Sequence, residues 1–118
     1  MMETYLYRHR LHVMRQLMYA ARTIPFIPTD DQFQKALDNT PKLKDRDKFI
    51  VGQYFNGHTP AFISNHLEKP ISRARVTQII QKTFRRMRGK GNLGLLNIGF
   101  TQEQLEQYNR ERFDYFGR

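Results

Sequence analysis

Apolar residues recur at helical spacing along most of the chain, and no stretch alternates apolar and polar residues for long enough to predict a strand. In residues 3–22, apolar residues recur at helical spacing at Leu6, Val13, Met14, Leu17, Met18 and Ala21. Spacings of three and four residues place such side chains on one face of a helix. The pattern predicts an all-α protein, a small helical domain of five to six helices.

Helix-capping residues give the starting points of four of the expected helices. A Ser or Thr that accepts a hydrogen bond from the first turn, a Gln three residues later and a Pro at the first helical position are all typical of helix N-termini. Such signals occur at Thr29 with Gln32, at Thr59 with Pro60, at Ser72, and at Thr101 with Gln104. Together with the first segment and residues 44–56, they define the expected helices.

Core faces and breaks follow from the same pattern. We expect residues 44–56 to bury Phe49, Ile50, Val51, Tyr54 and Phe55, and the helix after Thr59 to bury Phe62, Ile63 and Leu67. Asn56-Gly57 breaks one helix, and the stretch GKGNLG at 89–94 breaks another. Aromatic residues in the tail, Tyr108, Phe113, Tyr115 and Phe116, either pack on the core or form a docking surface.

Composition limits the kind of protein. The 118 residues suit one domain, and 20 Lys and Arg against 11 Asp and Glu give a net charge of +9. A small domain with this charge typically binds a polyanion. Without cysteine the chain has no disulfide, thiolate metal site or cysteine nucleophile. The absence of cysteine also fits a cytoplasmic protein. Nucleic acid is the first candidate polyanion and an anionic membrane the second, but no apolar run reaches the roughly 20 residues of a membrane-spanning helix, and we expect no membrane among the partners.

The excess positive charge is concentrated in one segment. Residues 69–90 hold eight basic residues and no acidic residue. The helix from Ser72 to about Arg88 combines this charge with an apolar stripe, formed by Val76, Ile79, Ile80, Thr83, Phe84 and Met87. Solvated helix faces usually mix charges of both signs. We therefore expect the apolar stripe to pack on the core and the opposite face to bind a polyanion.

A helix beginning at Thr59, a turn, and a longer helix beginning at Ser72 have the layout of a helix-turn-helix. In that motif the second helix enters the major groove and flanking cations contact phosphates. The expected phosphate contacts are Lys69, Ser72, Arg75, Lys82, Arg85, Arg86 and Arg88. Double-stranded DNA is the partner that this arrangement predicts.

Residues 43–88, LKDRDKFIVGQYFNGHTPAFISNHLEKPISRARVTQIIQKTFRRMR, carry a family resemblance. The most specific run is Ser72-Arg73-x-Arg75-Val76-x-Gln78-Ile79, followed by Lys82, Phe84 and Met87-Arg88. This stretch resembles region 4 of the bacterial sigma-70 family, and parts of it are shared with other helix-turn-helix families such as LuxR-like regulators. The resemblance implies a winged-helix-like DNA-binding fold, binding to promoter −35 elements and contact of residues 43–56 with the β flap of RNA polymerase.

The resemblance also implies which residues read bases. The matching positions are Arg73, Ala74, Thr77 and Gln78. Ala74 stands where the family commonly has an acid, and Thr77 where it commonly has Arg. Ala and Thr can contact a thymine methyl group, whereas a bidentate guanine contact needs Arg or Lys.

We expect three segments in one compact domain: an N-terminal helical segment (1–40), the sigma region 4-like helix-turn-helix (41–90), and a linker with an amphipathic C-terminal helix (91–118). The chain has no room for the sigma region that melts the −10 element. The expected protein is therefore a stand-alone, nucleoid-associated transcription regulator of the phage or mobile-element type, and a homodimer through its first or last helix is possible.

Three alternatives use the same residues differently. A terminase small-subunit-like protein would use the helix-turn-helix to mark DNA for packaging, and a region 4 mimic would bind RNA polymerase without reading DNA. A small basic ribonuclease needs converging acid–base groups, and no spacing in the sequence gathers them. We therefore expect a protein that is not an enzyme and that has no cofactor and no metal.

Overall fold

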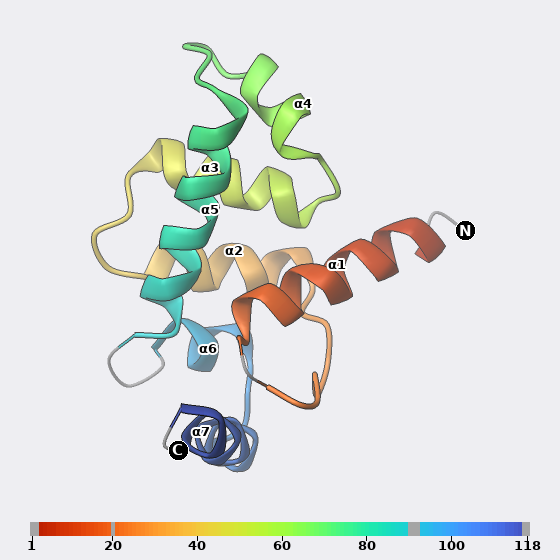
Figure 1. Ribbon diagram of the computed structural model, residues 1–118, viewed down its shortest axis with the longest axis vertical. Coiled ribbons are helices and arrows are strands. Elements are labelled where there is room, and N and C mark those ends of the chain that lie inside the picture. Colours follow the sequence, from red (N-terminus) through yellow and green to blue (C-terminus); the bar gives the residue numbers. More distant parts are fainter. Residues whose placement is uncertain (1–2, 20, 90–92, 117–118) are drawn as a thin grey trace.

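The computed structural model describes residues 3–19, 21–89 and 93–116, and these residues form seven α-helices and no strand. The expectation of an all-α protein is confirmed (Figure 1). The helices are α1 (Glu3–Leu17), α2 (Asp30–Asn39), α3 (Asp45–Phe55), α4 (Pro60–Asn65), α5 (Arg73–Met87), α6 (Leu93–Ile98) and α7 (Gln102–Phe116).

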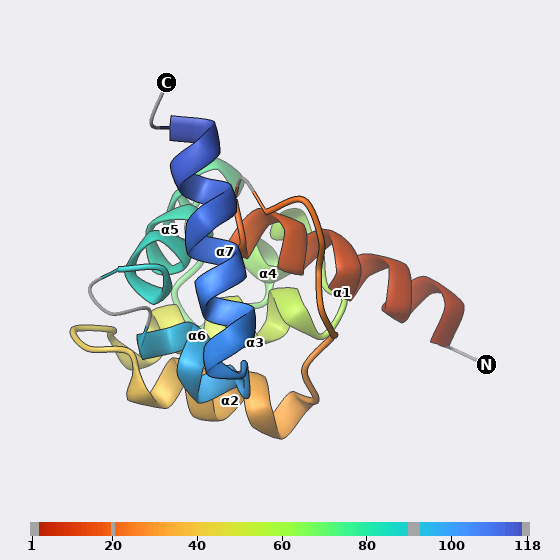
Figure 2. The ribbon, with the colours of Figure 1, turned by 90° about the horizontal axis from the view of Figure 1, so that it is seen from below.

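The helices surround a single apolar core. α5 packs against α3 and α4, α2 packs against α3 and α6, and α1 contacts both α3 and α5. α7 lies below α6 and is seen end-on in Figure 1 and lengthwise in Figure 2. Six of the seven helices each place at least two buried apolar side chains in this core. The short helix α4 contributes one, Ile63.

Local hydrogen bonds confirm the expected helix starts. The Thr29 hydroxyl accepts from the backbone N–H of Gln32, and the Gln32 side chain accepts from the backbone N–H of Thr29. Thr101 and Gln104 make the same reciprocal pair at α7. These bonds satisfy backbone N–H groups that the first turn of a helix leaves without partners.

The first helix is shorter than expected. The sequence predicted it to continue to Arg22, but α1 ends at Leu17. The carbonyl groups of Gln16 and Leu17 accept hydrogen bonds from the Arg88 guanidinium, at 3.1 and 2.8 Å. A side chain from a distant helix thus satisfies carbonyls that the end of a helix leaves free.

Two residues expected in the core are exposed. Phe49 on α3 is 51% exposed and Phe62 on α4 is 41% exposed. The other residues predicted for the α3 core face are buried, whereas Leu67 is only partly buried against the core. The prediction was wrong for Phe49 and Phe62. Each of these residues lies beside the buried face of its helix, because that face covers fewer residues than the apolar pattern of the sequence suggests.

The expected count of five to six helices is too low, because α6 lies inside the stretch that we interpreted as a linker. Leu95 and Ile98 are fully buried, and α6 packs closely against α2. A Cβ atom at Gly94 would lie 2.8 Å from the Cα atom of Met87. Glycine therefore allows α6 to approach the end of α5 more closely than any other residue would.

The aromatic residues of the tail were expected either to pack on the core or to form a docking surface, and the structure shows both buried and exposed ones. Tyr108 is 1% exposed and belongs to the core, together with Leu105. Phe113 and Tyr115 are exposed, and the side chain of Phe116 lies outside the described part of the structure.

Candidate nucleic-acid interface

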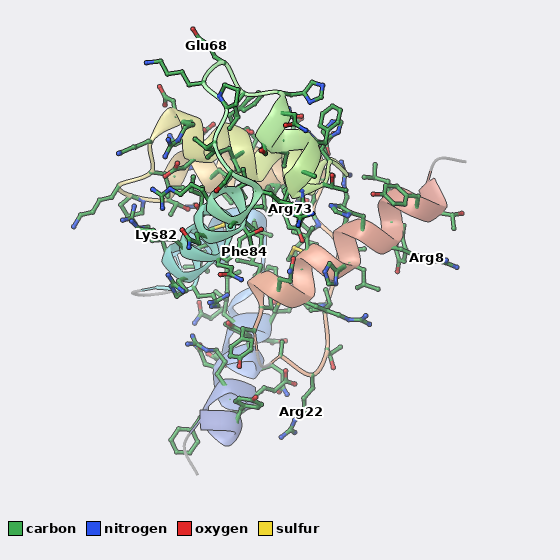
Figure 3. The ribbon with its side chains drawn as sticks, turned by 45° about the horizontal axis from the view of Figure 1, so that its top comes forward. Arg8, Arg22, Glu68, Arg73, Lys82 and Phe84 are labelled. Carbon is green, nitrogen blue, oxygen red and sulfur yellow. The ribbon has the colours of Figure 1, made fainter. Side chains whose placement is uncertain are left out.

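α5 separates its apolar and cationic side chains as the sequence predicts. Its buried residues are the six residues of the predicted stripe, Val76, Ile79, Ile80, Thr83, Phe84 and Met87. They fix the helix against α3 and α4, so that its opposite face is held on the outside of the molecule. Figure 3 shows Arg73 and Lys82 on this outer part of α5, while Phe84 lies between α5 and α1.

The four residues predicted to read bases lie in the first two turns of α5. Arg73, Ala74 and Gln78 are exposed, and Thr77 is half-buried. Ala74 and Gln78 are four residues apart, so they lie one above the other on the same face of the helix. The structure therefore brings small and polar side chains together on the half of α5 nearest the connection to α4.

The residues predicted to contact phosphates fall into two groups. Lys69, Arg75, Lys82 and Arg85 are exposed, and their side chains make no hydrogen bond or ion pair with any other residue that the structure describes. Ser72 is also exposed, but its hydroxyl accepts a hydrogen bond of 3.0 Å from the backbone N–H of Arg75 and so caps α5.

Arg86 and Arg88 have partners within the protein. Arg86 donates to the carbonyl of Lys42, in the connection between α2 and α3. Arg88 is half-buried, and burial lowers the pKa of its guanidinium. This group donates to two α1 carbonyls and lies 5.9 Å from the centre of the Tyr19 ring, so both Arg86 and Arg88 have partners inside the protein.

The connection between α4 and α5 runs from residue 66 to residue 72. The Ser64 hydroxyl donates a hydrogen bond of 2.5 Å to the carbonyl of Ile71, and this bond holds the end of the connection against α4. The seven residues exceed the three to four residues typical of a helix-turn-helix turn. α4 and α5 nevertheless contact each other closely.

α5 carries the largest excess of positive charge among the seven helices of the described residues. α5 contains no acidic residue, and its last turn carries Arg85 and Arg86. Acidic residues are instead found at the starts of α2, α3 and α7, where the helix dipole favours negative charge. Since like charges repel along α5, its outer face gains most from a partner that supplies negative charge.

A second surface feature lies where α3 meets the connection to α5. A groove of about 670 Å³ has an apolar lining from Phe49, Leu67 and Ile71 and a charged lining from Asp45, Arg46, Glu68 and Lys69. The apolar pattern predicted Phe49 in the core, so this groove was not expected from the sequence. One feature of the sequence could have indicated that Phe49 is exposed. Residues Phe49 to Val51 form an unbroken apolar run, and a helix that packs on one side cannot bury every residue of such a run.

The histidines of α4 and its flanks stack on the second exposed phenylalanine. The Phe62 ring lies between those of His58 and His66, at centroid distances of 4.5 and 3.9 Å. His66 also shares a hydrogen bond of 2.7 Å with the carbonyl of Phe62. The stack covers part of the outer side of α4, and sequence reasoning about Phe62 did not anticipate it.

Among the residues that the structure describes, no helix is long and apolar enough to cross a membrane. No three side chains of the metal-ligating types His, Cys, Asp and Glu gather in this part of the chain. Comparison of the chain with protein-family models, with curated proteins and with solved structures finds no match.

Proposed function

We propose that this protein is a DNA-binding transcription regulator in which α4 and α5 act as a sigma region 4-like helix-turn-helix. The observation that carries the proposal is the outer face of α5. It is exposed, strongly cationic and free of acids, and its cations Arg73, Arg75, Lys82 and Arg85 have no partner among the described residues. A partner with regularly spaced negative charges, such as the DNA backbone, suits such a face.

In this proposal the two halves of α5 have different roles. Arg73, Ala74, Thr77 and Gln78, in the first two turns, face base edges in the major groove. Gln can make two hydrogen bonds with adenine, and Ala and Thr can contact a thymine methyl group. Lys82 and Arg85, further along the helix, contact phosphates and contribute affinity without sequence preference.

We also propose that the groove beside α3 binds a protein, with the β flap of RNA polymerase as the candidate that the sigma resemblance supplies. The exposed Phe49 ring and the mixed charges around it support this proposal, since an exposed aromatic residue in a groove is typical of protein docking sites. A regulator with both surfaces would act at promoters, in the cytoplasm at the nucleoid, as phage-type stand-alone regulators do.

The decisive experiment is a binding titration against a random duplex library at two salt concentrations, with sequencing of the selected duplexes. We expect one enriched sequence family and an affinity that falls steeply as salt rises. Arg85→Ala should weaken binding to every duplex about equally and lower the salt slope by about 0.9, the value for one phosphate contact.

Other outcomes would favour the alternatives. Binding to RNA polymerase without any binding to duplexes would favour a region 4 mimic, and the groove beside α3 would then be its binding surface. Ring-shaped oligomers in solution, with DNA binding, would favour a terminase small-subunit-like protein.

A further inference from the structure

α1 carries a second cationic face. Arg8, His12 and Arg15 are exposed and are spaced by four and three residues, which places them on one side of the helix. The opposite side holds Val13 and Met14, both fully buried. Arg8 and Arg15 make no hydrogen bond or ion pair with any residue that the structure describes, so their charge is not neutralised within this part of the protein.

The end of α1 is fixed against the end of α5. The guanidinium of Arg88 donates to the carbonyls of Gln16 and Leu17, and its centre lies 5.9 Å from the centre of the Tyr19 ring. Figures 1 and 2 both show the first part of α1 projecting away from the other helices, while its last turns lie beside α5. A preset geometry of this kind reduces the entropy lost when both helices bind one partner.

A hollow of about 390 Å³ joins the two helices. Gln16, near the end of α1, and Tyr19, just after it, line the hollow on one side, and Gln81, Arg85 and Arg88 line it on the other. The apolar residues Ile80 and Phe84 complete the lining, and no carboxylate lines the hollow. The five polar side chains can donate hydrogen bonds, so the surface between the two helices adds no negative charge that would oppose a polyanion.

We propose that α1 is a second DNA-contacting element, with Arg8, His12 and Arg15 on the phosphate backbone beside the segment that α5 enters. This inference rests on the proposed function and extends its footprint from one helix to two. The contribution expected of α1 is affinity without base reading, because contacts with phosphates carry no sequence information.

The burial pattern of α1 favours nucleic acid over a membrane surface. A helix that lies on a membrane inserts its apolar face into the lipid. The apolar residues Val13, Met14 and Leu17 are fully buried in the protein core and are not available to lipid. The exposed Tyr5 is held by a hydrogen bond of 3.1 Å from its hydroxyl to the carbonyl of Gly57.

The test measures how DNA affinity depends on salt for the full chain. Arg8→Ala/Arg15→Ala removes two proposed phosphate contacts, and Lys35→Ala/Lys44→Ala removes two exposed cations outside α1 and α5. We expect the slope of log affinity against log salt to fall by about 1.8 for the first pair, at about 0.9 per contact, and not to change for the second. Arg8→Lys/Arg15→Lys, which keeps the charges, should retain most of the slope.

Each contrary result has a distinct meaning. An unchanged slope for Arg8→Ala/Arg15→Ala, with a lowered slope for Arg85→Ala, would overturn the role of α1 and leave the proposed function intact. If the unaltered chain bound no duplex, both proposals would fail. Loss of binding to phosphatidylserine–phosphatidylcholine vesicles in Arg8→Ala/Arg15→Ala, without a change in the DNA slope, would assign α1 to a membrane and overturn the inference.

Discussion

α5 and α7 are helices of equal length with opposite electrostatic character. Each has 15 residues, and each begins after a hydroxyl side chain that accepts a hydrogen bond from the first turn. Both pack an apolar face against the same core. Yet α5 contains five basic residues and no acidic residue, whereas α7 contains two basic and four acidic residues.

The difference lies in where the charges of each helix find their partners. On α7, Glu111 accepts hydrogen bonds from the side chain of Gln107 and from the backbone N–H of Arg22, and Arg110 donates to Gln107. On α5, the four outward cations have no such partners among the described residues. The exposed acids Glu103 and Glu106 of α7 also lack partners among the described residues, but α7 mixes charges of both signs, whereas α5 carries positive charges alone. An amphipathic pattern thus predicts packing for both helices, and the charge of a single sign is what distinguishes the outer face of α5.

The largest expected effect tests whether the two helices contribute equally to the core. Ile79 on α5 and Leu105 on α7 are each 3% exposed. Truncation of a buried Ile or Leu to Ala typically costs 2–5 kcal/mol, so Ile79→Ala and Leu105→Ala should each lower the free energy of unfolding by about that amount. Urea titrations measure this change. A cost below about 1 kcal/mol for Leu105→Ala alone would show that α7 is an accessory to the core.

A smaller effect tests the difference in binding. Gln78→Ala should remove a base contact and change the preferred base at one position by about 1–3 kcal/mol. Gln102→Ala, which truncates an exposed glutamine at the start of α7, should leave the preference unchanged. Selection from a duplex library measures both. Uniform weakening on all sequences by Gln78→Ala would contradict base reading by this residue.

The smallest effect concerns the buried acid of α7. Burial raises the pKa of the Glu111 carboxyl, but hydrogen bonds from Gln107 and from the backbone of Arg22 outweigh it, so the net pKa lies below its usual value of 4.5. A carboxyl whose pKa is lowered by folding stabilises the protein above its unfolded pKa, and this stabilisation is lost as the pH falls through the folded pKa.

Glu111→Gln should therefore make the stability of the protein less sensitive to pH below about 4.5, with a smaller difference between urea midpoints at neutral and acidic pH. The comparable change on α7 at an exposed acid, Glu106→Gln, serves as the control. Equal acid sensitivity in the unaltered chain and in Glu111→Gln would contradict the assignment.

Features that depend on neighbouring residues could be predicted from the sequence. The capping pairs Thr29–Gln32 and Thr101–Gln104 and the apolar stripe of α5 involve residues within one or two turns of each other, and all were confirmed. Helix α6 could not be predicted in this way. It has six residues, includes Gly94 and is held by its packing against α2 and α5, and such short helices depend on tertiary contacts.

In the candidate site, too, local features could be predicted from the sequence and contacts between distant residues could not. The exposure of Arg73, Ala74 and Gln78 follows from their position opposite the apolar stripe. The partners of Arg86 and Arg88 are carbonyl groups 44 to 72 residues away. No local pattern distinguishes an arginine that binds such a carbonyl from one that meets solvent. Base reading and phosphate contact remain predictions for binding experiments.

The hydrogen bonds of Arg88 join residues far apart in the sequence, and this affects how the chain folds during synthesis. Chains leave the ribosome from the N-terminus onward. The last carbonyls of α1 receive their hydrogen bonds from residue 88, and α2 packs against α6, which begins at Leu93. The first two helices therefore emerge with much of their apolar surface uncovered, and a nascent chain that stops before Arg88 lacks the contacts that hold α1 in place.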